Sequence, residues 1–345
     1  MTDVALRAPG SRRRLFGDLV STLLWLPLGG LLFSQIVIWL KVAEPMIGTI
    51  EQFAVQLTAT AVIGAVLALA FRRGAQVAVF AVLAVTLAWP VFAAHRPAAV
   101  VSDGARLKVV SANLWFAAPT HQPTLDMLMA SDADIIGLVE VSEPWVQALA
   151  PLFAKYPYRV DCFATVPECE TVLLSKLPLT KPRAERVFGV APVVVGGEVD
   201  WNGRTFEVLA THLAWPFTPD YESRWAVITD PENAPYLQGG LPANRQTSQA
   251  GNLAKFINTL PPDVLLMGDF NGAPWSRLQR AFRTSTGLDN AAGWDFSWPA
   301  VLPWPLRLPI DHVLSRGHLG VTNFDAGPEL DSDHVPVIAE IGWRD

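Results

Sequence analysis

The segment from Leu265 to Gly272 ends an apolar run with two polar side chains one residue apart. Its sequence, Leu-Leu-Met-Gly-Asp-Phe-Asn-Gly, predicts a buried strand that stops at a ligand site, because ligands bind beyond the strand ends of parallel and mixed sheets. On an extended segment Asp269 and Asn271 face the same side. The carboxylate can then orient a water molecule while the carboxamide holds a neighbouring oxygen. A simple Asx turn is the alternative for these two residues.

Other apolar runs also border on a polar residue. A single Asn, Glu or His at a strand end is usually an ordinary turn or surface residue, but several such endings in one chain predict a shared site. The residues concerned are Asn113 after 109–112, Glu140 after 135–139, His212 after 209–211, Asp311 after 309–310, and Asp333 and His334 before 335–338.

The residue types suggest a divalent metal and a phosphate. An Asn oxygen and two carboxylates form a hard donor set, which suits Mg²⁺ or Mn²⁺ and disfavours a zinc site built from His and Cys. We therefore predict Asn113, Glu140 and Asp333 as metal ligands. His212 and His334 suit contacts to a phosphate, because an imidazole can be neutral or cationic.

This ordered set of motifs resembles the endonuclease/exonuclease/phosphatase superfamily, which includes pancreatic deoxyribonuclease, abasic-site endonucleases, sphingomyelinases and inositol-polyphosphate phosphatases. The resemblance covers residues 107–341, and its most specific elements are Gly268-Asp269-Phe270-Asn271 and Ser332-Asp333-His334. It implies an α/β fold, a four-layer sandwich in which two mixed β-sheets pack face to face with helices outside. Residues 214–243 match none of these motifs, so the resemblance does not identify the substrate contacts.

The resemblance also implies a role for each site residue. Asp311 orients His334, and His212 contacts the phosphate. Asp269 is then the carboxylate that positions or deprotonates the attacking water, while Asn271 steadies the phosphate or the water. The metal would neutralise charge on the pentacovalent transition state.

The remaining periodicity agrees with such a fold. His312 points to the opposite face of the strand from its neighbour Asp311 and is predicted to be structural. Asn202-Gly203 is a strong hairpin signal. Helices are predicted over 123–131, 144–153 and 244–260, and strands over 171–175, 193–200 and 205–212.

The N-terminal third has the composition of a membrane anchor. Three apolar segments each have the ~20 residues needed to cross a bilayer. They are 19–40, 53–71 and 75–94. We therefore predict an anchor over 1–94 and a catalytic domain over 95–345. A cleaved signal peptide is a poor alternative for the first segment, which is too long and has no small-residue cleavage site before Lys41.

Charged residues beside these segments predict the topology. Arg12 to Arg14 precede the first segment, and Arg72-Arg73 lies between the second and third. The positive-inside rule therefore places the N-terminus in the cytoplasm, and three crossings leave the catalytic domain outside it. This makes the protein a multi-pass protein of the plasma (inner) membrane with a periplasmic catalytic domain. Cys162 and Cys169 would then lie in an oxidising compartment, where a disulfide is favoured over two free thiols.

Charge restricts the substrate. From His95 to Asp345 there are 19 Lys and Arg against 28 Asp and Glu, a net charge of −9. Nonspecific polynucleotide binding usually needs a basic stripe, and none is visible in this sequence. The expected partners are the lipid bilayer and a phosphate ester from nucleic acid, a nucleotide or a lipid headgroup; no protein partner is predicted. Alternatives are a catalytically silent binding scaffold and a transport or envelope-sensing protein.

Two aromatic segments flank the predicted site, Trp215-Pro216-Phe217 and the run from Trp298 to Pro305. They either pack on the domain, or line an apolar pocket or touch the bilayer interface, where Trp is favoured. Only twelve residues separate Ala94 from Leu107, at most ~40 Å of extended chain. The predicted site therefore stays near the bilayer.

Overall fold

The computed structural model describes residues 9–40, 49–95, 99–102, 104–166, 169–189, 192–216, 245–290 and 295–344. The chain divides into two compact units, Met1–Ala93 and Ala94–Asp345. Most of the 214–243 segment singled out above lies outside the described residues.

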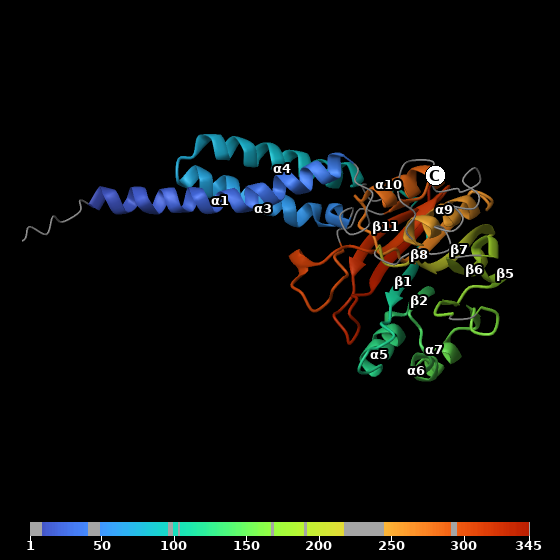
Figure 1. The fold of residues 1–345 in the computed structure, drawn as a ribbon. Coiled ribbons are helices and arrows are strands. Elements are labelled where there is room, and N and C mark those ends of the chain that lie inside the picture. Colours follow the sequence, from blue (N-terminus) through green and yellow to red (C-terminus); the bar gives the residue numbers. More distant parts are fainter. Residues whose placement is uncertain are drawn as a thin grey trace, which may run out of the picture. The chain divides into compact units, whose positions relative to one another are not determined.

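The first unit is helical (Figure 1). It contains α1 (Pro9–Trp39), a 3₁₀ turn η1 (Thr49–Phe53), α3 (Ala54–Ala70) and α4 (Gly74–Ala94). Three stretches, Gly17–Trp39, Thr49–Ala70 and Gly74–Ala94, are long and apolar enough to cross a membrane, judged by length and composition. The three apolar helices predicted from the sequence are therefore present.

The second unit contains two six-stranded mixed sheets. One has the strand order β11-β12-β1-β2-β4-β3 and the other β5-β6-β7-β8-β10-β9. The β1–β2 and β7–β8 pairs are parallel, and the other pairs are antiparallel. The strands are β1 (Leu107–Asn113), β2 (Ile135–Val139), β3 (Tyr158–Asp161), β4 (Val172–Ser175), β5 (Leu179–Arg186), β6 (Val193–Trp201), β7 (Arg204–His212), β8 (Val264–Asp269), β9 (Asp289–Asn290), β10 (Asp311–Arg316), β11 (Leu319–Ala326) and β12 (Val337–Trp343).

Apolar side chains alternate along these strands and build a core between the sheets. Val109 and Ile135 of one sheet share a buried cluster with Val208 and Met267 of the other. Two further clusters lie under the outer helices. Helices α5 (Gln122–Ser131), α6 (Glu143–Ala148) and α7 (Ala150–Lys155) cover the first sheet, and α9 (Arg245–Ile257) and α10 (Arg277–Thr286) cover the second. The predicted four-layer sandwich is confirmed.

The helix predicted over 144–153 is instead two short helices that meet at Leu149. Pro144 and Pro151 each occupy the first turn of one of them. Proline lacks the amide hydrogen that a helix interior needs, so Pro151 starts a new helix.

The strand registers place the polar residues at the same end of neighbouring strands in each sheet. In the second sheet His212 pairs with Asp269, and Asp269 pairs with Asp311. In the first sheet Asn113 lies opposite Val139, one residue before Glu140. Five of the polar residues noted in the sequence therefore lie at, or next to, corresponding ends of strands.

Gly268 allows the close approach of β7 and β8 at this end of the strands. Its φ is +142°, and a Cβ at this position would lie 1.8 Å from the carbonyl oxygen of Thr211. Only glycine fits this backbone. The Gly-Asp-Phe-Asn motif therefore needs glycine at its first position, where a larger residue would collide with the Thr211 backbone.

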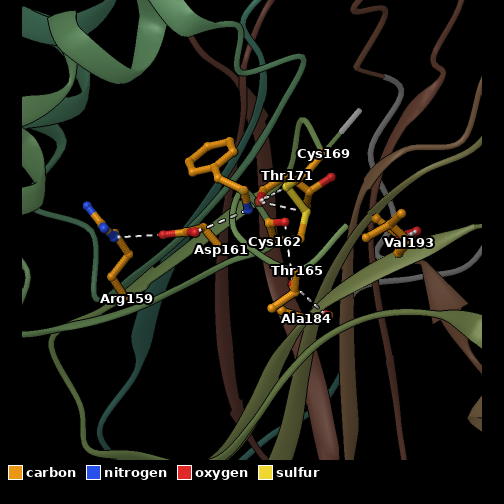
Figure 2. Close-up of a disulfide and its surroundings, with 10 residues drawn as sticks. Arg159, Asp161, Cys162, Thr165, Cys169, Thr171, Ala184 and Val193 are labelled. Atoms are coloured by element: carbon orange, nitrogen blue, oxygen red, sulfur yellow. Dashed lines mark hydrogen bonds and ion pairs between the residues drawn. A yellow bond between two sulfur atoms is a disulfide. The ribbon is translucent and has the colours of Figure 1, made fainter. Parts of the chain in front are cut away.

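Cys162 and Cys169 form a disulfide with a Cα–Cα distance of 5.4 Å, as the sequence predicts (Figure 2). The loop that it closes follows β3, at the edge of the first sheet. Within the loop the Thr165 hydroxyl donates to the carbonyl of Ala184 on β5, the edge strand of the second sheet, at 3.1 Å. The disulfide loop therefore connects the two sheets.

Candidate active site

The structure brings all eight predicted site residues into one cluster. Each has a polar atom within 4.0 Å of a polar atom of another member. The members are Asn113, Glu140, His212, Asp269, Asn271, Asp311, Asp333 and His334.

The key contacts of this cluster cross from one sheet to the other. Asn113 Nδ2, at the end of β1, donates to Asp269 Oδ2, at the end of β8, at 3.0 Å. His334, just before β12, contacts Asp311 of β10 with 2.8 Å between Nδ1 and Oδ2. The site therefore exists only when the two sheets are packed together.

His334 is held by both its backbone and its ring. Its backbone N–H donates to the Ser332 hydroxyl at 3.0 Å, and that hydroxyl donates to the carbonyl of Asn113 at 2.8 Å. Burial opposes the charged ring, but the nearby carboxylates of Asp311 and Asp269 prevail and raise the pKa of His334 to about 10. In the metal-free chain this imidazole is therefore cationic at neutral pH.

His212 has a carboxylate partner that the sequence did not reveal, Glu170. His212 Nδ1 lies 2.6 Å from Glu170 Oε1. Its Nε2 lies 3.2 Å from Asn271 Nδ2 and 3.7 Å from Asp269 Oδ2. Burial disfavours the charged ring, but Glu170 and Asp269 raise the pKa of His212 to about 9. The contact with the Asn271 amide alone would suit a neutral ring; the two carboxylates make the imidazolium the favoured form.

Glu170 lies two residues before β4, an antiparallel neighbour of β2. Because β2 and β4 run in opposite directions, the start of β4 lies beside the end of β2. The signal that could have identified it is an acidic residue before the strand predicted over 171–175, the position that Asp333 and His334 occupy before 335–338. Its carbonyl accepts a hydrogen bond from Val141, next to Glu140, at 3.0 Å.

Asp269 is the central carboxylate. Burial, together with the charge of Asp311, raises its pKa to about 6, although the two histidines and the Asn271 amide lower it. The Asn271 backbone N–H donates to Asp269 Oδ1 at 2.7 Å. The turn itself is held by Gln246 of α9, which donates to the carbonyls of Phe270 and Asn271. A carboxylate whose pKa is near neutral is suited to accept a proton.

The orientation of the Asn113 amide bears on its predicted role. Its Oδ1 accepts from the backbone N–H of Trp115 at 2.9 Å, so that Nδ2 points to Glu140 Oε1, at 2.8 Å, and to Asp269. In this arrangement Asn113 offers amide hydrogens to the centre and aligns two carboxylates. Its role as an oxygen ligand remains a prediction that requires the amide to turn.

The donor set fits a hard divalent cation. Asp333 Oδ1 is buried without a hydrogen-bond partner among the described residues, and its Oδ2 accepts from the Trp298 indole at 3.1 Å. Glu140 accepts from Asn113 and from the Phe116 backbone. Ligand atoms of Glu140, His212 and Asp269 lie within 4.8 Å of one another, as do those of Asp269, Asp311 and His334. Each of these two groups includes a histidine and neither includes Asp333; their carboxylate oxygens suit Mg²⁺ or Mn²⁺.

His312 lies outside this cluster, in agreement with the prediction that it is structural. Its Nε2 lies 2.8 Å from the carbonyl of Gly272, and its ring packs edge-on against Phe270. Burial lowers the pKa of His312 to about 4, so the ring is neutral.

Comparisons with solved structures agree with this architecture. An endonuclease/exonuclease/phosphatase from Bacteroides vulgatus is 15% identical, with a TM-score of 0.53 over 70% of this chain and 100% of that one. TDP2 from D. rerio, solved with a single strand DNA product, is 14% identical, with a TM-score of 0.50 over 69% of this chain and 100% of that one. At these identities the likeness shows the fold alone.

The sequence comparison is more direct. A search of curated proteins finds no match to this chain. Residues 110–334, however, match the Endonuclease/Exonuclease/phosphatase family, and this range runs from β1 to His334. The chain therefore belongs to the Endonuclease/Exonuclease/phosphatase family.

Proposed function

We propose that this protein is a membrane-anchored, metal-dependent phosphoesterase, a phosphodiesterase or nuclease-like hydrolase that acts outside the cytoplasm. One observation carries the proposal: two histidines, each held by a carboxylate, lie beside the buried carboxylate of Asp269. This arrangement supplies cationic donors for a phosphate and an acceptor for the proton of a water molecule.

Each residue then has a defined role. His212 and His334 donate N–H groups to phosphate oxygens, and Asp311 and Glu170 keep the two rings oriented and charged. Asp269 receives the proton of the attacking water. A divalent ion, Mg²⁺ or Mn²⁺, held by Glu140 and Asp333, and by Asn113 if its amide turns, would neutralise negative charge on the phosphate.

The remaining members of the cluster support these roles. Asn271 donates its side-chain N–H to the carbonyl of Leu213 at 2.8 Å, which fixes the amide beside His212. From there it can steady the phosphate or the water. A catalytically silent scaffold is a weaker alternative, because binding a partner gives no reason to bury Asp269 between two histidines.

Two observations bear on the substrate class, and they favour different substrates. The D. rerio TDP2 structure with a single strand DNA product supports a nucleic acid or nucleotide substrate. The net charge of −9 from His95 to Asp345 favours a smaller phosphate ester or a lipid headgroup. Both classes share the phosphate ester that the proposed roles require.

The proposed location is the plasma (inner) membrane, with the N-terminus in the cytoplasm and the catalytic unit in the periplasm. Three helices of membrane-spanning length and the basic residues beside them support this topology. The Cys162–Cys169 disulfide also supports an oxidising compartment.

A substrate panel on the purified full chain tests the proposal. The panel contains bis(p-nitrophenyl) phosphate, p-nitrophenyl phosphate, single-stranded DNA and a phospholipid, each with Mg²⁺ or Mn²⁺. Hydrolysis of at least one ester by the chain, with strong loss in Asp269→Asn, is the expected result. No hydrolysis of any ester, or equal rates for the chain and Asp269→Asn, would overturn the proposal.

A further inference from the structure

Six consecutive residues, Val301 to Leu306, form an exposed apolar loop, here called the apolar tip. Its sequence is Val-Leu-Pro-Trp-Pro-Leu, so its only polar side-chain atom is the indole nitrogen of Trp304. Val301 is 86% exposed, Trp304 56% and Leu306 52%. Single exposed apolar side chains are common on soluble surfaces, whereas a contiguous group marks an interaction site.

Several backbone groups of the apolar tip are hydrogen-bonded within the loop. The N–H of Leu302 donates to Pro299 at 3.0 Å, and the N–H of Leu306 donates to Pro303 at 2.9 Å. Pro303 and Pro305 have no N–H to satisfy. Backbone groups that are bonded internally can leave water at little cost, as contact with an apolar phase requires.

Arg307 completes the base of the apolar tip. Its buried guanidinium donates to the carbonyls of Leu302 and Ala300, each at 2.7 Å, and forms an ion pair with Glu329. This cation therefore fixes the loop from inside, and the apolar tip itself carries no charge that would have to be desolvated.

The apolar tip starts beside the candidate active site. The Ala300 N–H donates to the Asp333 carbonyl at 2.8 Å, and the Trp298 indole donates to the Asp333 carboxylate. The Trp298 ring also packs edge-on against Trp215, with centroids 4.8 Å apart. The residues that lead into the apolar tip are therefore attached to the candidate active site at Asp333.

We propose that the apolar tip enters the headgroup region of the bilayer that anchors the chain, so that the site meets phosphate esters carried by membrane lipids. This rests on the membrane anchoring and phosphoesterase activity proposed above. The chain supplies the reason for this occupant, because only twelve residues separate α4 from β1. Such a short tether keeps the catalytic unit close to the bilayer, so the effective concentration of lipid at its surface is high.

The composition of the apolar tip fits a lipid interface. Trp is favoured where headgroups meet acyl chains, and the neighbouring Leu and Val side chains are apolar enough to enter. The net charge of −9 from His95 to Asp345 disfavours a polynucleotide as the partner of this surface. The same charge means that apolar contact, and not attraction to anionic lipid, must hold the apolar tip.

Site-specific fluorescence tests the contact without any enzymatic assay. Both native cysteines are in the disulfide, so an introduced thiol can be labelled selectively. Val301→Cys carries an environment-sensitive dye, and Thr205→Cys, at an exposed position of the β6–β7 hairpin, is the matched control. Each full chain is placed, one copy per disc, in phosphatidylcholine nanodiscs with or without spin-labelled lipid.

We expect spin-labelled lipid to quench the dye at position 301 at least threefold more than the dye at 205, with no weakening in 0.5 M salt. Equal quenching at the two positions would overturn the proposal. A blue-shifted dye at 301 that lipid does not quench would also overturn it, because a protein surface would then cover the apolar tip.

A second measurement separates this inference from the proposed activity. Trp304→Asp should lower the ratio of lipid-ester to soluble-diester hydrolysis at least fivefold, whereas Thr205→Asp should leave the ratio unchanged. An unchanged ratio in Trp304→Asp, with both esters still hydrolysed, would refute the apolar tip's role and leave the phosphoesterase standing. If no ester were hydrolysed at all, the proposed function would fail, and the quenching would still report the lipid contact.

Discussion

Glu170 Oε1 and His212 Nδ1 lie 2.6 Å apart although the residues are 42 apart in sequence; Glu170 precedes β4 of one sheet and His212 ends β7 of the other. Together with the pairs Asp311–His334 and Asn113–Asp269, they make the site a junction between two sheets. Errors in the packing of the two sheets therefore affect all three pairs together.

The Glu170 carboxylate should matter for turnover through His212. Glu170→Gln removes the charge that raises the pKa of this histidine, and loss of a residue that orients a site group typically costs 10- to 100-fold. Turnover should fall by roughly that factor, and the alkaline limb of the pH–rate profile should move to lower pH. The exposed Glu143→Gln variant is the control. A fall in turnover without movement of that limb would contradict the assignment.

His334 and Asp269 should be the most sensitive positions. Positioned acid–base groups contribute about 10²- to 10⁴-fold, so His334→Ala and Asp269→Asn should each lower turnover by orders of magnitude. His318 is exposed and contacts Asp263 outside the cluster, so His318→Ala is the control. Single-turnover assays on folded protein check this, and wild-type turnover in His334→Ala would remove that residue from the mechanism.

His312 should affect stability, and its effect should depend on pH. Burial lowers its pKa to about 4 from an ordinary 6.5, so the folded chain resists protonating this ring. The stability that neutral His312 contributes is complete above pH 6.5 and is lost as the pH falls toward 4, by up to about 3 kcal/mol. His312→Gln should remove this dependence, as thermal unfolding between pH 4.5 and 7.5 can measure. His312→Ala should retain the turnover of the folded protein; a loss as large as in His334→Ala would show that the strand faces were wrongly assigned.

Much of the site could be predicted from the sequence because each predicted residue borders on an apolar run, at its end or at its start. A strand such as Val264–Asp269 is buried along its whole length, so its polar end is conspicuous. Glu170 also borders on a predicted strand, but its role depends on His212, a partner 42 residues away that residue types do not reveal. The orientation of the Asn113 amide depends on the Trp115 backbone, a contact that residue types do not reveal.

Edge elements were harder to predict from the sequence. β5 (Leu179–Arg186) contains Lys181, Pro182 and two arginines, and most of it is exposed or half-buried. Charged residues and proline are typical of edge strands, but they hide the alternation that identifies a strand. The pairing of the two sheets depends on contacts between distant residues, such as Val109 and Met267, that local periodicity does not contain.

The proposed topology makes a separate prediction. With Arg12 to Arg14 and Arg72-Arg73 in the cytoplasm, the C-terminus lies outside it. A C-terminal alkaline phosphatase, which folds only after export, should be active, and Cys162 and Cys169 should react with thiol reagents only after reduction. A C-terminal reporter that works only in the cytoplasm would overturn the topology. Free thiols in an exported domain would contradict the disulfide alone.

The metal dependence of phosphodiester hydrolysis by the full chain tests the proposed mechanism. Activity should vanish with chelator and return with Mg²⁺ or Mn²⁺. Glu140→Gln should raise the metal concentration for half-maximal activity roughly tenfold or more, with little change in thermal unfolding. The exposed Glu340→Gln is the control and should behave like the unmodified chain. Full turnover in the presence of chelator would contradict the proposed metal-dependent mechanism.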